Sequence, residues 1–291
     1  MLGLNEWFTY YQCTNCGHTH LENLPENIGK YYDTKEYYSF KSNNSFSGNN
    51  KKGIKEIIKY ILLFLNPKKG WGYSAAFKAF LSIKGIKKSS QILDYGCGAG
   101  HFVKELFDSG YINARGYDPF LPDNVYHSNE LFLAKDLSLL KIKIWDVITL
   151  NHVFEHLENP VQVLKNLHDL LAAKGKILLR FPVIDSYSFE KYKENWVQFD
   201  APRHLNLFTR KSIKLAVEKT GNLKIINMYD DSFHFQFTGS ELYLNQLSLQ
   251  PKNNNRKKRL LSFKTYYYHF FAKKLNKQNK GDQIVVILER I

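Results

Sequence analysis

The most regular hydrophobic pattern of the chain lies between residues 91 and 182, where short apolar runs alternate with stretches of helical periodicity. The run Val147–Leu150 is apolar except for Thr149, which is typical of a strand buried on both faces of a sheet. A helix-like pattern begins at His101, and Gly175 ends another helix just before the apolar run that starts at Lys176. This alternation predicts an α/β fold with a largely parallel sheet.

Before this segment the pattern predicts a polar loop followed by helices. Residues 42–53 are rich in Asn, Ser and Gly and show no periodicity, so we expect a mobile loop there. Apolar positions over 54–65 recur at helical spacing, and a second helix is expected over 73–83. We therefore predict a helical cap over residues 51–88, preceded by an N-terminal extension over 1–50.

After this segment the pattern predicts one more helix and the last two strands. Thr209 is placed to cap a helix over 212–220. Apolar runs over 223–228 and 283–288 fit the final strands. Between them we expect a basic, aromatic helical insertion over 239–281.

A glycine-rich turn follows the first strand of the pattern. Residues 91–100 read Gln-Ile-Leu-Asp-Tyr-Gly-Cys-Gly-Ala-Gly. Glycines at a strand–helix junction let backbone N–H groups approach a ligand closely. A dinucleotide fingerprint would need a glycine where the chain has His101, so the spacing disfavours that class of site. An ordinary glycine-rich turn is the alternative. The candidate binding residues here are Asp94, Gly96, Cys97, Gly98 and Gly100.

An acidic residue follows the glycines at a spacing typical of ribose recognition. Asp118 lies 18 residues beyond Gly100, at the end of the second expected strand, which Pro119 cannot continue. A carboxylate in that place can accept hydrogen bonds from a ribose diol. The alternative is a surface turn aspartate before a proline.

Together, the glycine motif, Asp118 and the two later strands resemble the class I S-adenosylmethionine-dependent methyltransferases. The resemblance implies a Rossmann-like seven-stranded sheet with helices on both faces, and S-adenosyl-L-methionine bound at the glycine turn. It also implies cofactor contacts at Asp136, beside the adenine amino group, and at Asn151 and His152, in the loop after the fourth strand. For Asp136 a solvated turn aspartate is the alternative.

Methyl transfer from a sulfonium also needs a group that aligns the acceptor and takes its proton. Histidine is the natural base, because its unperturbed pKa lies near neutrality. The segment Asp200-Ala-Pro-Arg-His204 resembles the Asp-x-Pro-x-His element of many sugar and small-molecule methyltransferases. We therefore predict His204 as the base or acceptor-orienting group. The predicted acceptor-lining residues are Glu155, His156 and Trp196, and Arg203 pairs either with an acceptor phosphate or with Asp200.

The N-terminal segment carries half of a zinc knuckle, Cys13-Thr-Asn-Cys16. It resembles the zinc-ribbon end of some sugar-modifying methyltransferases, but a tetrahedral site needs four ligands and no second Cys-x-x-Cys pair is present. His18 and His20 are the remaining nearby candidates. Cys13 and Cys16 are therefore either zinc ligands or part of a packed hairpin without metal.

The formal net charge of +14 is concentrated in two stretches. Residues 51–88 hold ten lysines against the single acid Glu56, and residues 252–280 hold ten Lys or Arg and no acid. Such a surface can attract an anionic membrane, a nucleic acid or a phosphorylated sugar or lipid. A solvated lysine face is the alternative. No RNA-binding motif is recognisable, so nucleic acid is not the favoured partner.

Composition limits the cellular setting that we expect. The 291 residues are 44% hydrophobic, enough for one sizeable core with a smaller appendage. We expect no membrane span, no signal peptide and, with three cysteines, a reducing cytoplasmic environment.

These observations favour a methyltransferase domain over residues 89–291. The expected acceptor is a small or carrier-linked molecule, most simply a sugar of a cell-surface glycan or a related metabolite. One alternative is a quinone- or lipid-type O-methyltransferase that uses the basic helices at a membrane. The other is a non-catalytic binding protein of the same fold. The oligomeric state is not predicted.

Overall fold

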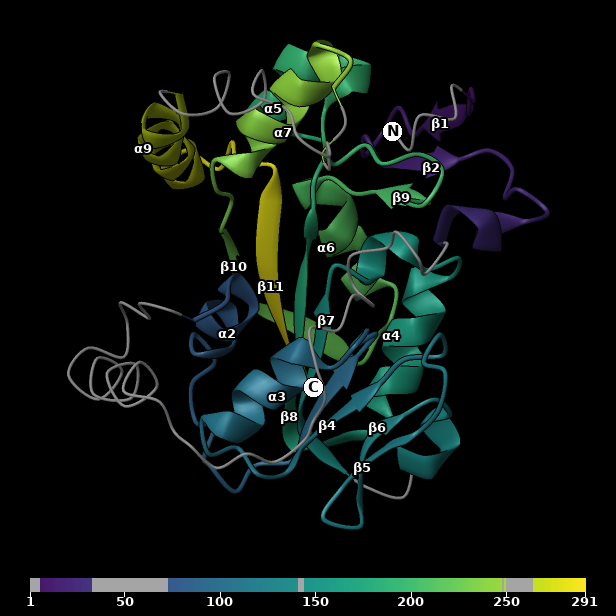
Figure 1. Cartoon of the computed structure of the whole chain (residues 1–291), viewed down its shortest axis with the longest axis vertical. Coiled ribbons are helices and arrows are strands. Elements are labelled where there is room, and N and C mark those ends of the chain that lie inside the picture. Colours follow the sequence, from purple (N-terminus) through teal and green to yellow (C-terminus); the bar gives the residue numbers. More distant parts are fainter. Residues whose placement is uncertain (1–5, 33–72, 141–143, 248, 250–263) are drawn as a thin grey trace. The chain divides into compact units, whose positions relative to one another are not determined.

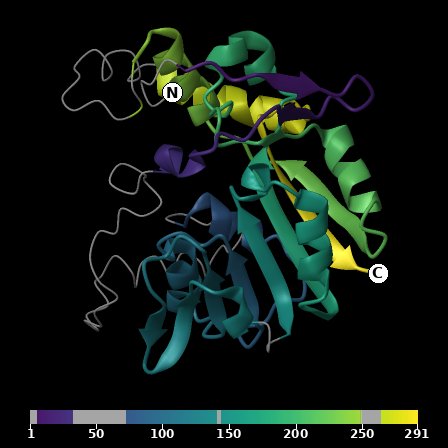
Figure 2. The ribbon, with the colours of Figure 1, turned by 90° about the vertical axis from the view of Figure 1, so that its right-hand side faces the viewer.

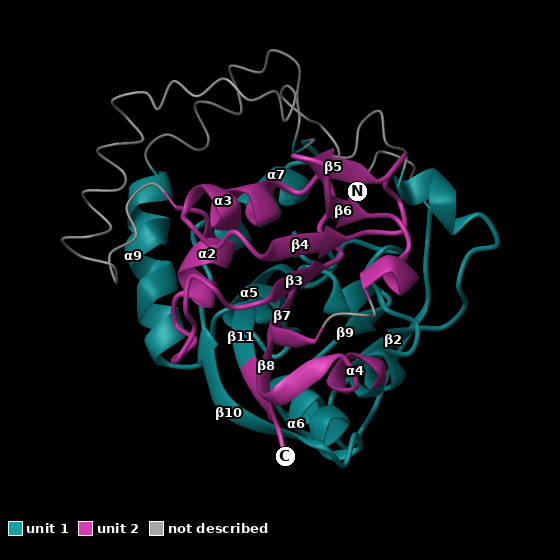
Figure 3. Cartoon of the chain, turned by 90° about the horizontal axis from the view of Figure 1, so that it is seen from below, with its two compact units in different colours: residues 1–32, 152–165, 180–286 teal, residues 33–151, 166–179, 287–291 magenta. Residues whose placement is uncertain are grey.

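The computed structural model describes residues 6–32, 73–140, 144–247, 249 and 264–291 (Figure 1). The predicted loop over 42–53, the predicted helix over 54–65 and most of the basic stretches lie outside these residues. The described chain falls into two compact units, which Figure 3 colours separately. Unit 1 comprises residues 1–32, 152–165 and 180–286, and unit 2 comprises residues 33–151, 166–179 and 287–291.

An eight-stranded sheet has the strand order β10-β11-β8-β7-β3-β4-β6-β5. Its longest strands are β8 (Leu171–Pro182), β10 (Leu223–Asp230) and β11 (Gln283–Arg290). Strands and helices alternate along the chain, which confirms the predicted α/β, Rossmann-like class. The sheet has one strand more than the seven that we expected.

Parallel pairing organises the strands of unit 2. β3 (Ile92–Tyr95) pairs in parallel with both β4 (Ala114–Tyr117) and β7 (Trp145–Asn151). β4 also pairs in parallel with β6 (Glu130–Ala134). The strand beyond the expected seven, β5 (Val125–His127), forms an antiparallel hairpin with β6.

Among the described residues of unit 2, three helical segments accompany these strands. α2 (Ala75–Phe80) begins at Ser74, whose side chain accepts a hydrogen bond from the Phe77 N–H, and so confirms the centre of the predicted helix over 73–83. α3 (His101–Asp108) follows the glycine turn. The 3₁₀ segment η3 spans Leu137–Leu140.

Unit 1 contains a second, three-stranded sheet with the order β1-β2-β9. The hairpin of β1 (Tyr10–Gln12) and β2 (Thr19–Leu21) is the purple ribbon of Figure 2. β2 also pairs with β9 (Asn206–Leu207), so the N-terminal segment lies against the segment that follows His204. The short 3₁₀ segments are η1 (Ile28–Tyr32), η4 (Phe154–His156) and η5 (Lys193–Asn195).

Two α-helices of unit 1 begin at polar side-chain caps. α5 (Tyr187–Tyr192) is capped by Ser186, and α6 (Arg210–Glu218) by Thr209, which confirms the predicted cap. Thr209 and Ser212 cap each other's backbone N–H groups reciprocally. The remaining helices are α4 (Pro160–His168), which both units share, α7 (Phe235–Leu244) and α9 (Lys264–Lys277). No helix among the described residues is long and apolar enough to cross a bilayer.

The insertion before the last strand supplies part of the core of unit 1. Tyr268, Ala272 and Leu275 lie on one face of α9 and pack with Phe237 of α7 and with Trp196. The Trp196 side chain is fully buried, and its Nε1 donates a 3.0 Å hydrogen bond to Asp282. Trp196 is therefore part of the packed core.

The buried Asp282 carboxyl generates a stability prediction. Burial raises its pKa to about 6, against an ordinary value of 3.8, so ionisation of this group destabilises the folded state. The folded chain binds a proton at this site before the unfolded chain does, and stability from this group rises as pH falls from above 6 toward 4. We expect Asp282→Asn to unfold at a higher temperature than the wild type above pH 7, and this advantage to disappear toward pH 4.

Thermal unfolding followed by circular dichroism across this pH range checks the prediction. Asp108→Asn, which changes an exposed aspartate paired with Lys104, is the control and should show no such pH-dependent difference. An Asp282→Asn advantage that stays constant with pH would contradict the prediction.

Candidate active site

The glycine turn has a backbone that only glycine adopts readily. Gly96, Gly98 and Gly100 have φ angles of 78°, 53° and 76°, in the left-handed region. Gly100 is also the N-cap of α3, and a Cβ atom built on it would lie 2.5 Å from Cδ1 of Leu133. Backbone conformation and lack of space therefore both require glycine at position 100.

The turn is tied to the end of the neighbouring strand β4. The N–H groups of Gly96 and Cys97 donate to the Tyr117 carbonyl over 2.7 and 2.9 Å. The Gly98 N–H donates to Oδ2 of Asp118 over 2.8 Å, and the Phe120 N–H donates to Oδ1 of Asp118 over 2.9 Å. The two predicted cofactor elements, the glycine turn and Asp118, therefore meet directly. Burial raises the pKa of Asp118.

Asp94 joins the turn to β7. The register of the parallel pair sets Asp94 beside Thr149, whose hydroxyl donates to Oδ1 of Asp94 over 2.7 Å. The Asn151 amide donates to the same oxygen over 3.4 Å. Burial raises the pKa of Asp94 to about 7. The structure thus brings Asn151, predicted from the later strand, next to the acid of the glycine motif.

The other two predicted cofactor residues of unit 2 have different surroundings. Burial raises the pKa of the Cys97 thiol, and its Sγ would lie 2.6 Å from a Cβ atom built on Gly116, so this cysteine fills space beside β4. Asp136 is exposed, and its Oδ1 accepts a 2.8 Å hydrogen bond from the Ser138 N–H. Its charge contributes, after burial, Tyr95 and Asp118, to the raised pKa of Tyr117, so Asp136 lies close to the strand end that holds the turn.

In unit 1 the predicted catalytic residues form one cluster. Glu155 and His156 lie on η4, and His204 lies in the loop before β9. Oε1 of Glu155 lies 3.9 Å from Nε2 of His204 and 3.3 Å from Nδ1 of His152. The rings of His156 and His204 meet edge to face, with centroids 4.8 Å apart. Glu155 is fully buried and His204 is 4% exposed.

Backbone carbonyls determine which nitrogen of each clustered histidine carries its proton. Nδ1 of His204 lies 2.8 Å from the Gln198 carbonyl, and Nδ1 of His156 lies 2.8 Å from the Arg203 carbonyl. A carbonyl only accepts, so both Nδ1 atoms carry hydrogen and each neutral ring keeps its lone pair on Nε2. Burial lowers the pKa of His204 to about 4, which keeps this ring neutral near pH 7.

His152 has the same tautomer as His156 and His204, but for a different reason. The Arg180 guanidinium lies 2.9 Å from Nε2 of His152 and can only donate, so the hydrogen of a neutral His152 is on Nδ1, on the side of Glu155. Burial raises the pKa of Glu155, but His152, whose Nδ1 lies at ion-pair distance, and the other nearby histidines outweigh this effect and hold the pKa at about 2. Glu155 is therefore a buried carboxylate at neutral pH.

Two predicted neighbours of the cluster have protein partners. The Arg203 guanidinium lies 2.5 Å from Oδ2 of Asp200, which is one of the two pairings that the sequence left open. Trp196, expected to line the acceptor pocket, is buried in the core described above.

The cysteine hairpin is ordered by main-chain hydrogen bonds. The Cys13 N–H donates to the His18 carbonyl, and the Gly17 N–H donates to the Cys13 carbonyl, each over 2.8 Å. His18 and His20 both hydrogen-bond Oδ1 of Asn206, over 3.2 and 3.1 Å. The two histidines thus have partners in β9, and zinc binding by Cys13 and Cys16 stays a prediction.

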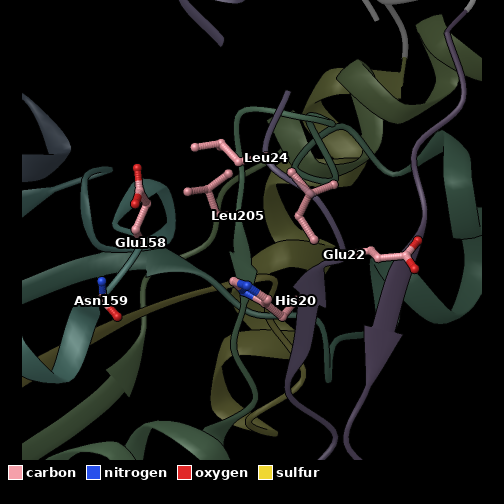
Figure 4. Close-up of a pocket in the computed structure, with 7 residues that line it drawn as sticks. His20, Glu22, Leu24, Glu158, Asn159 and Leu205 are labelled. Carbon is pink, nitrogen blue, oxygen red and sulfur yellow. The ribbon is translucent and has the colours of Figure 1, made fainter. Parts of the chain in front are cut away.

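A pocket of about 250 Å³ opens within unit 1 (Figure 4). The chain places its wall close to the cluster, because Leu205 follows His204 and Glu158 comes two residues after His156. The wall combines carboxylate, amide and imidazole groups with leucine side chains. The lining residues are His20, Leu21, Glu22, Leu24, Glu158, Asn159 and Leu205.

Comparison with known proteins adds one family. A family model described as a methyltransferase domain matches residues 70–225, which is more than half of the chain. The curated proteins contain no significant match.

Several solved structures are similar to this chain at low sequence identity. A SAM-dependent methyltransferase from Archaeoglobus fulgidus is 21% identical, with a TM-score of 0.42 over 82% of this chain and 95% of that one. An O-methyltransferase of a polyketide synthase from Brevibacillus brevis, in complex with S-adenosyl-L-homocysteine, is 15% identical. Its TM-score is 0.45 over 79% of this chain and 78% of that one.

The contacts of Asp118 generate a binding prediction. We expect Asp118→Ala to weaken the binding of S-adenosylhomocysteine at least tenfold, because the variant loses charged hydrogen bonds to the ligand and the anchor of the Gly98 N–H. Isothermal titration calorimetry measures the effect, with circular dichroism to verify folding. Asp123→Ala, at an exposed position after the same strand, is the matched control and should bind as the wild type does. Equal affinities of Asp118→Ala and the wild type would contradict the assignment of Asp118.

Proposed function

Because the chain belongs to the methyltransferase domain family, we propose that it transfers a methyl group from S-adenosylmethionine to a hydroxyl group of a sugar. Family membership confirms the predicted enzyme class and cofactor. The observation that carries the proposal is the glycine turn, whose N–H groups are held by the end of β4 and by Asp118. The sugar belongs to a cell-surface glycan or a related metabolite, free or linked to a carrier.

The pocket of unit 1 supports a small polar acceptor. Its volume of about 250 Å³ is below the roughly 300–1,000 Å³ typical of drug-sized ligands, so it suits a single ring better than a long chain. Glu22, Glu158 and Asn159 supply the carboxylate and amide groups that hydrogen-bond sugar hydroxyls, and the leucines supply apolar contact.

The proposed reaction is an in-line displacement at the methyl carbon. The acceptor oxygen forms a bond to this carbon while the carbon–sulfur bond breaks, and its electron pair goes to sulfur to give S-adenosylhomocysteine. The hydroxyl proton leaves to a base, and Nε2 of His204 has the free lone pair for it, because Nδ1 donates to Gln198. Glu155 and His156 orient the acceptor beside His204.

A transfer assay tests the function. The protein is incubated with S-adenosylmethionine labelled in its methyl group and, in separate reactions, a panel of nucleoside-diphosphate sugars and a panel of quinols and phospholipids. The proposal expects label in the sugar panel. Label confined to the quinol or lipid panel would contradict the acceptor class, and S-adenosylhomocysteine binding without transfer to any panel would favour a non-catalytic binding protein.

The role of His204 generates a kinetic prediction. We expect His204→Asn to lower kcat on the labelled acceptor by about 10²–10⁴-fold, the range for loss of a general base. The affinity for S-adenosylhomocysteine should not change. His269→Asn, at an exposed histidine of α9, is the control and should keep full turnover. Undiminished turnover of His204→Asn would exclude His204 as the base.

The outer face of α9 supports a second candidate, an O-methyltransferase that meets its acceptor at a membrane. Tyr266, Tyr267 and Phe270 are 74%, 63% and 51% exposed, on the side away from the buried residues of the same helix. Lys273 and Lys274 follow them on the next turn. Exposed aromatic side chains beside lysines are typical of helices that lie in a membrane interface.

Liposome flotation separates the two candidates. The membrane candidate expects the wild type to float with vesicles containing phosphatidylglycerol, and the double variant Tyr266→Ser/Phe270→Ser to float less. Tyr126→Ser, at another exposed tyrosine, serves as the control. Absence of wild-type flotation would exclude the membrane candidate and leave the sugar proposal.

A further inference from the structure

We infer that Glu155, His156 and His204 bind one divalent transition-metal ion of the zinc type. Each side chain offers one ligand atom, and these three atoms all lie within 4.8 Å of one another. Two imidazoles and one carboxylate are the protein ligands of a common class of catalytic zinc site, in which the fourth position stays open. This inference deepens the proposed function, because the same residues act on the acceptor there.

The surroundings of the Glu155 carboxylate favour a bound cation. The side chain is fully buried, and neither oxygen has a hydrogen bond of acceptable geometry to any residue that the structure describes. The His152 Nδ1 that lies 3.3 Å from Oε1 is at ion-pair distance only. A buried carboxylate without hydrogen bonds is costly, so the carboxylate favours a cation that the protein alone does not supply.

The orientation of His156 and His204 also favours a bound metal ion. Each donates its Nδ1 hydrogen to a backbone carbonyl, at Gln198 for His204 and at Arg203 for His156. Hydrogen bonds of this kind characterise metal-ligating histidines, because they fix the tautomer and the ring and leave Nε2 to bind the metal. The supporting contacts of a metal site are therefore present.

The two arginines next to the cluster form ion pairs with other carboxylates. The Arg203 guanidinium pairs with Asp200 at 2.5 Å, and Arg180 pairs with Asp231 at 2.6 Å. The cluster itself then holds a carboxylate and two imidazole lone pairs, which are all acceptors. One positive ion at their centre satisfies all three.

The donor set favours zinc over magnesium. Imidazole suits zinc and related transition metals, whereas magnesium prefers oxygen ligands and keeps several waters. Zinc bonds of about 2.1 Å place tetrahedral ligand atoms roughly 3.4 Å apart, so the three side chains close inward when the ion binds. A bound ion would hold the acceptor oxygen at its open position and lower the pKa of the hydroxyl, so that its proton would leave to solvent water in place of transfer to His204.

Zinc binding to the purified chain tests the inference. The protein is stripped of metal and titrated with zinc chloride alone in a calorimeter, and its melting temperature is measured with and without zinc. We expect one zinc per chain and a rise in melting temperature. Glu155→Gln should bind zinc at least tenfold more weakly and show little rise. Without metal it should be at least as stable as the wild type, because its amide donates to the imidazole lone pairs that repel a carboxylate.

A matched control removes the other candidate zinc ligands. The double variant Cys13→Ser/Cys16→Ser should keep the zinc stoichiometry of the wild type. Zinc binding lost in the cysteine variant but kept in Glu155→Gln would overturn the inference, as would binding of magnesium without zinc, or no metal binding. S-adenosylhomocysteine is titrated into the same samples. Its binding without zinc binding overturns the metal inference alone, and its failure to bind counts against the proposed function alone.

Discussion

The parallel pairing of β3 with β4 on one side and β7 on the other is the constraint on which the cofactor site depends. It places the carboxyl ends of three strands at one edge, so the glycine turn, Asp118 and Asn151 meet although they are far apart in sequence. The Tyr117 carbonyl and the Asp118 carboxylate then hold the N–H groups of the turn. Ligands of open α/β sheets bind at such strand ends, because loops and helix N-termini converge there.

His152 directly follows Asn151 in the chain, and its Nδ1 lies 3.3 Å from Glu155 of the cluster formed with His156 and His204. Three arrangements serve that cluster: η4 carries Glu155 and His156, β9 follows His204, and β2 pairs with β9. Burial of a carboxylate between histidines costs stability unless a proton, a substrate or a metal compensates it. A local loss of folding stability of this kind is typical of a functional site, because the groups needed for the reaction are not those that stabilise the fold best. The short strands β2 and β9 and two backbone carbonyls keep His156 and His204 in place.

The sequence predicted those parts of the molecule that depend on local chemistry. Left-handed glycines, the Thr209 cap and the apolar run of β7 each have a short-range cause, and all three occur as expected. The eighth strand was missed because β5 is a three-residue arm of a hairpin, and its turn at Ser128 and Asn129 has no glycine to signal it. The acidic residue at 118 was recognisable from its spacing alone, but its hydrogen bond to the Gly98 N–H was not.

The properties of the histidine cluster could not be predicted, because they depend on contacts between distant segments. The sequence named Glu155, His156 and His204 as candidates, and they do lie together. It could not show that Glu155 has no hydrogen bond within the described part of the chain, or that the carbonyls of Gln198 and Arg203 set the tautomers of His204 and His156. Trp196 was misplaced by the same kind of reasoning. It was predicted to line the acceptor pocket because it lies in a long connection, but its side chain packs in the core.

We propose that the glycine turn holds S-adenosylmethionine and not a dinucleotide. Titration of the wild-type chain with S-adenosylhomocysteine, and separately with NAD⁺, tests it most directly. The account predicts saturable binding of one S-adenosylhomocysteine per chain and no binding of NAD⁺, because His101 replaces the glycine that a dinucleotide fingerprint requires. Binding of NAD⁺ without binding of S-adenosylhomocysteine would contradict it.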